Sequence, residues 1–213
     1  MKLRPPLNVV RHGLIDYQAA VALQQEYSAM RRAKEIGDTL LLVEHPPVVT
    51  LGIRKESAAD LLAPREELKR RGVELVQTDR GGLATLHAPG QLVGYYFVRL
   101  HGIPGGLRVL IASIHHLLIG TCAEFGVEAT EGADEPGVWI GPRKIASLGL
   151  AIRRGITRHG FALNVANDLE LFSLLRPCGH QSGVMTSLSR ELRRTVQVDE
   201  VAARLAQLAK EGD

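Results

Sequence analysis

The feature that most constrains the fold is the alternation of helical and extended segments along the whole chain, with no internal repeat and no low-complexity linker between them. Segments that alternate in this way favour an α/β or α+β fold, in which helices cover a mixed sheet. With 213 residues and 45% hydrophobic content, the chain can bury a substantial core. We therefore expect residues 1–213 to form a single domain.

Local signals place the individual elements. Capping and periodicity predict helices at about 17–36, 64–72, 107–125 and 199–210. Asp16 and Asp199 are the expected caps of the first and last of these. Runs of apolar and β-branched residues predict strands at 39–44, 48–51, 73–78, 91–100, 137–140, 143–153 and 157–165. The turn at Gly141-Pro142 makes a hairpin of the two strands that flank it.

Cysteine content and hydropathy favour a cytoplasmic protein. Two cysteines, Cys122 and Cys178, do not make a disulfide framework, which is typical of a reducing compartment. Residues 1–6 lack the apolar core of a signal peptide. The apolar stretch 39–52 is interrupted by the run Glu44-His45-Pro46-Pro47, so it predicts no membrane span.

The net charge of +3 and a pI near 9.0 mildly favour acidic partners. The basic residues are scattered in pairs and triplets, which is typical of solvated faces. Aromatic residues make up only 4% of the chain and leave little material for stacking nucleic-acid bases. An acidic carrier protein fits this surface at least as well as nucleic acid, and we expect neither nucleic-acid nor membrane binding.

A first candidate site is the segment Arg80-Gly81-Gly82-Leu83-Ala84-Thr85-Leu86-His87-Ala88-Pro89-Gly90-Gln91. Its paired glycines permit backbone conformations that other residues avoid, and they let a ligand approach main-chain N–H groups. His87 stands just before a Pro-Gly turn, where a side chain can be displayed at the edge of a cleft. The spacing fits neither the dinucleotide fingerprint nor a phosphate-binding loop. A structural turn with a hydrogen-bonded histidine explains the same pattern.

A second candidate is Lys144, in the expected strand 143–153. With a period of two, it shares a face with Ala146, Leu148, Leu150 and Ile152. Because that face is otherwise apolar, we expect it to point inward and to take the ammonium group out of water, which suits proton transfer. The alternative is that the ammonium reaches solvent from the strand end. Ser147 and Gly149 are expected on the opposite face, where glycine leaves room for a ligand.

A third candidate is Cys178, whose neighbours Pro177 and Gly179 place the thiol in a turn. The charges of Arg176 and His180 favour its thiolate, and a lysine brought beside it by folding could accept its proton. Cys178 and Lys144 together therefore suggest acyl transfer through a thioester, although 34 residues separate them. His180 is a rival base for a Cys/His pair.

Two further patterns argue against a second reactive cysteine and against a metal site. Cys122 lies in an apolar helical stretch and fits an inert, buried thiol. The eight histidines show no helical pair at metal-ligand spacing, since His115 and His116 are adjacent and diverge around the helix. We therefore expect no metal site.

Taken in order along the chain, the motifs resemble those of octanoyltransferases, also called lipoate–protein ligase B. The matching segments span about half of the chain and are Arg80-Gly81-Gly82, Thr85-Leu86-His87-Ala88-Pro89-Gly90-Gln91, Gly137-Val138-Trp139-Ile140, Lys144-Ile145-Ala146-Ser147-Leu148-Gly149, His159-Gly160-Phe161-Ala162-Leu163-Asn164, Pro177-Cys178-Gly179 and Thr186-Ser187-Leu188. Ala88 stands where this family usually has glycine, and Leu86 where an aromatic residue is common. We expect both departures to reshape the acyl pocket.

The resemblance implies a fold like that of the biotin and lipoate protein ligases. It implies that Cys178 is the nucleophile that carries the acyl thioester, and that Lys144 favours its thiolate and shuttles protons. The residues that the resemblance places around the octanoyl group are Arg80, Gly81, Gly82, Leu83, Ala84, Thr85, Leu86, His87, Ser147, Leu148, Gly149, Gly160, Phe161 and Ala162. No cofactor is implied.

The implied reaction moves an octanoyl group from octanoyl-acyl carrier protein to a lysine of lipoyl domains, as the first step of endogenous protein lipoylation. The implied acceptors are the E2 subunits of 2-oxoacid dehydrogenases and the glycine cleavage H protein, and the enzyme is expected to act as a monomer. Three alternatives stay open. They are an ATP-dependent lipoate ligase, a cysteine hydrolase or amidase that uses His87 or His180, and a non-catalytic acyl-binding module.

Overall fold

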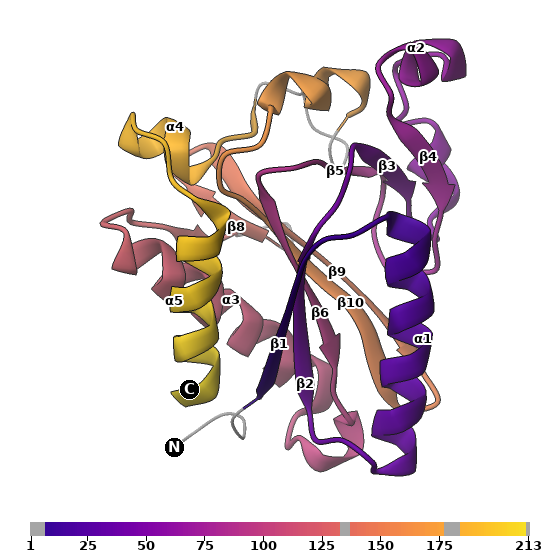
Figure 1. Cartoon of the computed structure of the whole chain (residues 1–213), viewed down its shortest axis with the longest axis vertical. Helices are drawn as coiled ribbons and strands as arrows, with labels where there is room; N and C mark the ends of the chain where they lie inside the picture. Colours follow the sequence, from indigo (N-terminus) through magenta and orange to yellow (C-terminus); the bar gives the residue numbers. More distant parts are fainter. Residues whose placement is uncertain (1–6, 133–136, 177–183, 212–213) are drawn as a thin grey trace.

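A seven-stranded mixed sheet forms the centre of the molecule (Figure 1). The computed structural model describes residues 7–132, 137–176 and 184–211. The strand order is β1-β2-β6-β10-β9-β8-β7; β1 and β2 pair in parallel, and the other neighbours are antiparallel. The strands span β1 (Asn8–Leu14), β2 (Thr39–Glu44), β6 (Gln91–Phe97), β7 (Thr130–Glu131), β8 (Gly137–Ile140), β9 (Arg143–Arg153) and β10 (Ile156–Asn164).

Helices cover both faces of this sheet, as Figure 1 shows. Helix α1 (Tyr17–Ala33) packs on one face, against β6 and β10. Helices α3 (Gly106–Glu124) and α5 (Val198–Glu211) lie on the opposite side and contact each other. The expected α/β architecture with a mixed sheet and flanking helices is therefore confirmed.

A second, three-stranded sheet stands beside the end of the first. Its order is β4 (Glu74–Gln77), β3 (Val48–Leu51) and β5 (Thr85–His87), with β3 parallel to β4 and antiparallel to β5. The short elements of the fold are α2 (Arg65–Arg70), α4 (Leu188–Leu192), and the 3₁₀ turns η1 (Lys55–Ala58), η2 (Leu100–Gly102) and η3 (Leu169–Leu174).

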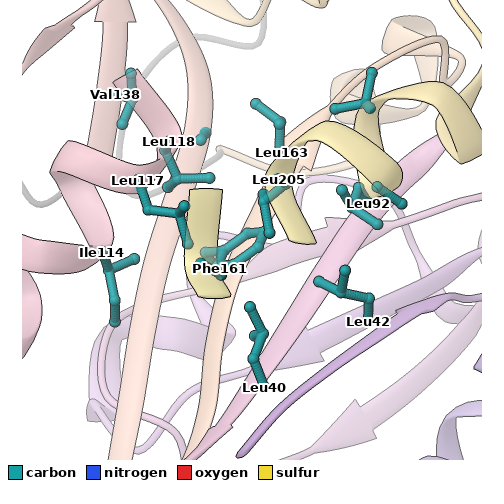
Figure 2. Close-up of a cluster of buried hydrophobic side chains, with 14 of the residues drawn as sticks. Leu40, Leu42, Leu92, Ile114, Leu117, Leu118, Val138, Phe161, Leu163 and Leu205 are labelled. Atoms are coloured by element: carbon teal, nitrogen blue, oxygen red, sulfur yellow. The ribbon is translucent and has the colours of Figure 1, made fainter. Parts of the chain in front are cut away.

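The largest hydrophobic cluster lies between the seven-stranded sheet and helices α3 and α5. Figure 2 shows how leucines of β2 and Phe161 of β10 meet side chains of both helices, among them Ile114, Leu118 and Leu205. A smaller cluster packs α1 onto the other face of the sheet, and a third packs the three-stranded sheet against η3. Burial on both faces fixes which way each central strand presents its side chains.

Helix α3 is the longest apolar helix in the described part of the chain, with a mean hydropathy of 1.4 over an 18-residue window. By length and composition alone it could cross a membrane. One side of it is buried in the core, at Leu110, Ile114, Leu118 and Cys122 among others. The apolar stretch 39–52 supplies the two short strands β2 and β3.

The expected elements are confirmed with shifts at their ends, but Asp199 does not cap the last helix, because α5 begins at Val198 and contains Asp199 in its first turn. Asp16 caps α1 by accepting from the backbone N–H groups of Gln18 and Ala19. The helix ends at Ala33 rather than near Ile36, because Lys34 takes a left-handed conformation at φ 67°. Strand β1 was not predicted. It is an edge strand with mostly exposed residues, so it lacks the apolar pattern of a buried strand.

Candidate active site

A hollow of about 40 Å³ lies where the seven-stranded sheet meets the loop that leads into β5. Eleven of the fourteen predicted binding residues line it, namely Arg80, Gly82, Leu83, Thr85, His87, Ser147, Leu148, Gly149, Gly160, Phe161 and Ala162. Tyr17, Val93, Tyr95 and His159 complete the lining. We call this hollow the acyl cavity.

The floor of the acyl cavity is made of glycines on two paired strands. Gly149 of β9 lies opposite Gly160 of β10, and Ser147 lies opposite Ala162. A methyl group on Gly160 would stand 2.2 Å from the carbonyl oxygen of Gly94, and one on Gly149 would stand 2.9 Å from that of Gly81. Side chains at these two positions would collide with backbone, so the cavity depends on glycine there.

The loop that carries Arg80 is held between the two sheets. The buried Arg80 guanidinium donates to the Thr50 carbonyl at 2.5 Å and to the Thr50 hydroxyl at 2.9 Å. The next N–H, of Gly81, donates to the Leu150 carbonyl at 2.9 Å. This loop therefore bridges β3 and β9 and forms the roof of the acyl cavity.

Three of the predicted binding residues are not among those that line the cavity. Ala84 and Leu86 are fully buried in the cluster under the three-stranded sheet, and Gly81 makes the backbone bond described above. Leu86 alternates with the cavity residues Thr85 and His87 along β5 and points to the other side. Neither Leu86 nor Ala88 is among the described residues that line the cavity, so these two departures do not contact an acyl group there directly.

Two buried histidines stand at one side of the cavity. Nδ1 of His45 donates to the Ile15 carbonyl at 2.8 Å, so its Nε2 accepts from the Tyr95 hydroxyl at 2.7 Å. The ring of His87 stacks on Tyr17, with centroids 6.0 Å apart. Burial lowers the pKa of His45 to about 4 and that of His87 to about 3. Both rings are therefore neutral at pH 7.

A buried chain of hydrogen bonds links His87 to the strand that carries Lys144. Nδ1 of His87 meets Gln91 Oε1 at 2.7 Å, and Gln91 Nε2 donates to Asn164 Oδ1 at 2.9 Å. Asn164 Nδ2 donates to the Thr186 carbonyl, and the Thr186 N–H donates to the Lys144 carbonyl, both at 2.9 Å. Buried amides that satisfy one another in this way rigidify a site. The sequence offered two interpretations of His87, a hydrogen-bonded structural residue and a residue at a ligand cleft. His87 fits both, because it bonds to Gln91 and also lines the acyl cavity.

Lys144 is buried, with 1% of its surface exposed, but its face of the strand differs from the expected one. Trp139 pairs with Lys144 whereas Val138 pairs with Ala146, so Ile145 is an extra residue that forms a β-bulge. The bulge reverses the alternation. Val138 and Ala146 therefore face the large core, while the ammonium of Lys144 lies 5.3 Å from the centre of the Trp139 ring on the opposite face.

The side of β9 on which Lys144 lies is the side that lines the acyl cavity. Beyond the bulge, Ser147 and Gly149 line the cavity, and Ala146 faces the core. Lys144 therefore shares its side of the sheet with Ser147 and Gly149, not with Ala146, Leu148, Leu150 and Ile152 as the period of two predicted. The ammonium does not reach solvent from the strand end, because the Nζ atom is fully buried.

Cys178, together with its neighbours Pro177, Gly179 and His180, lies outside the described residues. The chain on each side of 177–183 is fixed. The Arg176 N–H donates to the Asp60 carbonyl at 2.7 Å, and Met185 bridges to Lys144. Met185 follows Cys178 by seven residues in the sequence. The predicted nucleophile is thus close in sequence to a residue that is paired with the predicted base.

Comparisons with known proteins identify the family. Residues 16–209 match the model of the lipoyl protein ligase A/B catalytic domain. An octanoyltransferase of Nitratidesulfovibrio vulgaris strain Miyazaki F is 45% identical over 190 residues, which cover 87% of this chain and 84% of that protein. One from strain DP4 is 50% identical over 184 residues, which cover 84% and 82%. The chain belongs to the octanoyltransferase family. As a member of it, the protein is an acyltransferase.

Solved structures show the same fold at lower identity. The bipartite lipoate protein ligase of Thermoplasma acidophilum superposes with a TM-score of 0.73 at 17% identity, covering 96% of this chain and 82% of that one. The biotin protein ligase of Aquifex aeolicus with biotin and ATP gives 0.55 at 13% identity, covering 96% and 69%. The expected likeness to the biotin and lipoate ligase fold is confirmed for this octanoyltransferase family member.

Four cavity residues were missed from the sequence. Tyr17 follows the Asp16 cap, and Val93 and Tyr95 lie in a strand that was predicted without a site. His159 was part of a family motif, but it was not assigned to the binding site. In the described ranges, no group of three or more His, Cys, Asp and Glu side chains is placed to hold a metal ion.

The buried histidines predict a loss of stability in mild acid. Each has its ordinary pKa of 6.5 when unfolded and a lower one when folded, so the unfolded state binds more protons below pH 6.5. Stability is therefore full above pH 6.5 and falls toward pH 4 for His45 and pH 3 for His87. At pH 5 each contributes a loss on the order of 2 kcal/mol. Urea unfolding at pH 7 and pH 5 measures it.

A variant separates this effect from general acid sensitivity. His45→Gln should reduce the loss of stability between pH 7 and pH 5 by its own share, on the order of 2 kcal/mol, and leave the share of His87, even if it lowers stability at pH 7. His116→Gln, at an exposed position on α3, should leave that dependence unchanged. Equal stabilities of the unaltered protein at the two pH values would contradict the assignment of neutral, buried rings.

Proposed function

We propose that this enzyme transfers an octanoyl group from octanoyl-acyl carrier protein to a lysine of lipoyl domains, through a thioester on Cys178. One observation carries the proposal: the acyl cavity and the buried Lys144 lie on the same face of β9. A cavity floored by glycines accepts a narrow aliphatic chain, and the lysine stands beyond one end of it. The proposal includes a cytoplasmic location and a monomeric enzyme, in keeping with the cysteine content and charge.

The first half-reaction loads the enzyme. Lys144, in its neutral form, accepts the proton of the Cys178 thiol, and the thiolate sulfur attacks the carbonyl carbon of the carrier thioester. The tetrahedral intermediate then breaks its bond to the carrier sulfur. Lys144 returns its proton to that departing thiolate, so the base is neutral again and the octanoyl group is held on Cys178.

The second half-reaction makes the amide. The amine of the lipoyl-domain lysine attacks the octanoyl carbonyl, and Lys144 accepts the proton that the amine loses. The bond to the Cys178 sulfur breaks, and Lys144 protonates this leaving group. Exchange between two thioesters is nearly balanced in free energy, and conversion of a thioester to an amide is downhill. The sequence of steps therefore needs no ATP.

The test is a transfer assay without nucleotide. Purified enzyme, octanoyl-acyl carrier protein and an apo lipoyl domain are mixed, and the mass of the lipoyl domain is followed. The expected result is a gain of one octanoyl group at the same rate with and without ATP. Transfer only with ATP and free octanoate would overturn the proposal in favour of a lipoate ligase. Release of free octanoate with no gain on the lipoyl domain would favour a hydrolase.

An acyl-binding module gives another result in the same assay. The protein would retain octanoyl or octanoate, and neither the lipoyl domain nor the free acid pool would gain mass. Such an outcome would overturn the proposed transfer.

A further inference from the structure

One end of the acyl cavity lies toward Lys144, the predicted base, and the other end is closed by side chains. Moving along β9 away from Lys144, the cavity passes the pair Ser147 and Ala162, then the pair of glycines, and reaches the level where Leu150 lies opposite His159. Three residues separate the first level from the last, which is about 10 Å of strand. That span is comparable to an extended eight-carbon chain. His159 therefore stands where the tail of an octanoyl group would end.

An unusual backbone conformation places the His159 ring there. His159 has φ +57°, in the left-handed region, although it lies inside a strand. It therefore leaves the alternation of β10, and its ring joins the cavity face beside Tyr95, with centroids 6.2 Å apart. The His159 N–H donates to Gln24 Oε1 at 3.0 Å, and Nε2 donates to Asp79 Oδ1 at 2.8 Å. Gln24 of α1 thus holds the backbone of His159, and Asp79 holds its ring.

Asp79 is itself fixed. Arg158 and Arg153 both pair with Asp79 Oδ2, the second at 3.1 Å. The hydrogen bond from His159 and these positive charges outweigh burial and hold the pKa of Asp79 below its usual range. The carboxylate therefore stays ionised at neutral pH, and the bond to His159 persists.

A second hollow lies directly behind the ring. It has a volume of about 210 Å³, and its mixed lining includes Val21 and Val76 beside polar residues such as Gln24, Asp79 and Arg158. His159 lines both this hollow and the acyl cavity. A longer acyl chain would have to displace the ring to enter this hollow, and the half-buried Asp79 carboxylate would then lose its hydrogen bond to His159.

We propose that His159, held by Asp79, is the far wall of the acyl cavity and sets the length of the acyl chain that the enzyme transfers. The inference rests on the proposed function, because it places the acyl group in this cavity with its carbonyl toward Lys144. His159 touches the tail of the chain and not the reacting carbonyl. It acts on chain-length preference rather than on the chemical steps.

Two variants at this position separate the volume of the ring from its hydrogen bond. His159→Asn shortens the side chain and suits the left-handed backbone, since asparagine adopts that region readily. His159→Phe keeps the bulk of the ring but cannot bond to Asp79. His116→Ala, at an exposed position on α3, is the matched control. Circular dichroism and thermal unfolding verify that each variant is folded.

The experiment measures kcat/KM for transfer to an apo lipoyl domain from carrier proteins loaded with C6, C8, C10 and C12 chains. For His159→Asn the ratio of the C10 rate to the C8 rate should rise about tenfold or more, because each methylene in an apolar pocket changes kcat/KM by about that factor. His159→Phe should keep the preference for C8. His116→Ala should match the unaltered enzyme for every chain.

The outcomes separate the two proposals. If the unaltered enzyme transfers C8 and His159→Asn shows the same chain-length profile, the wall is elsewhere and the inference is overturned alone. If the unaltered enzyme transfers no chain of any length, the proposed function fails and the inference fails with it. If His159→Asn does not fold, His159→Phe provides the test. A preference of folded His159→Phe for chains longer than C8 would contradict the inference, because that variant keeps the bulk of the ring.

Discussion

Replacing Cys178 with alanine is expected to lower octanoyl transfer by about 10⁴-fold or more, because the variant has no sulfur to form the acyl-enzyme. The measurement is the mass of the intact enzyme after mixing with octanoyl-acyl carrier protein in the absence of ATP. The unaltered enzyme should gain one octanoyl group and lose it when an apo lipoyl domain is added. Cys178→Ala should gain none.

The second cysteine of the chain provides the matched control. Cys122 is fully buried in helix α3, and burial raises the pKa of its thiol to about 12, so it carries no thiolate at neutral pH. Cys122→Ala should form the adduct and transfer octanoyl at the rate of the unaltered enzyme. Full transfer by Cys178→Ala would rule out the thioester mechanism, whatever the control shows.

Replacing Lys144 with methionine should lower kcat/KM for transfer by about 10²–10⁴-fold, which is the usual contribution of a general acid–base group. Methionine keeps an unbranched chain beside Trp139, so the packing of the strand is retained while the amine is lost. Lys69→Met, at an exposed position on α2, should transfer at the unaltered rate.

Thiol alkylation distinguishes a lysine that acts on Cys178 from one that only binds substrate. In the unaltered enzyme, iodoacetamide should modify Cys178 rapidly at pH 7, since the thiolate is the reactive form. Lys144→Met should slow this reaction in the absence of any acyl donor. An unchanged alkylation rate together with impaired transfer would mean that Lys144 does not promote the thiolate.

Local patterns were sufficient to predict most of the fold. The β8–β9 hairpin follows from its Gly-Pro turn, and α1 begins after Asp16 because an aspartate side chain can satisfy the free N–H groups of the first turn. Strand β1 escaped prediction because its pairing partner β2 lies beyond an intervening helix. The pairing of β1 with β2 places it at the edge of the sheet, and the residues of β1 alone do not indicate that pairing.

The site was predictable where it is contiguous and not where it depends on tertiary contacts. The segments around Arg80, Ser147 and Gly160 could be recognised as motifs, and they meet in the cavity. The face of Lys144 was wrong because a single bulge residue, Ile145, reverses the alternation on which the prediction relied. Tyr17 and His159 reach the cavity through a helix position and a left-handed residue, and neither leaves a periodic signal in the sequence.

The described residues on either side of 177–183 are held by different parts of the fold. Arg176 is bonded to Asp60, near the three-stranded sheet, and Met185 is bonded to the seven-stranded one. The proposed nucleophile therefore lies, in the sequence, between contacts to two different sheets, so the relative placement of those sheets bears on catalysis as well as on stability.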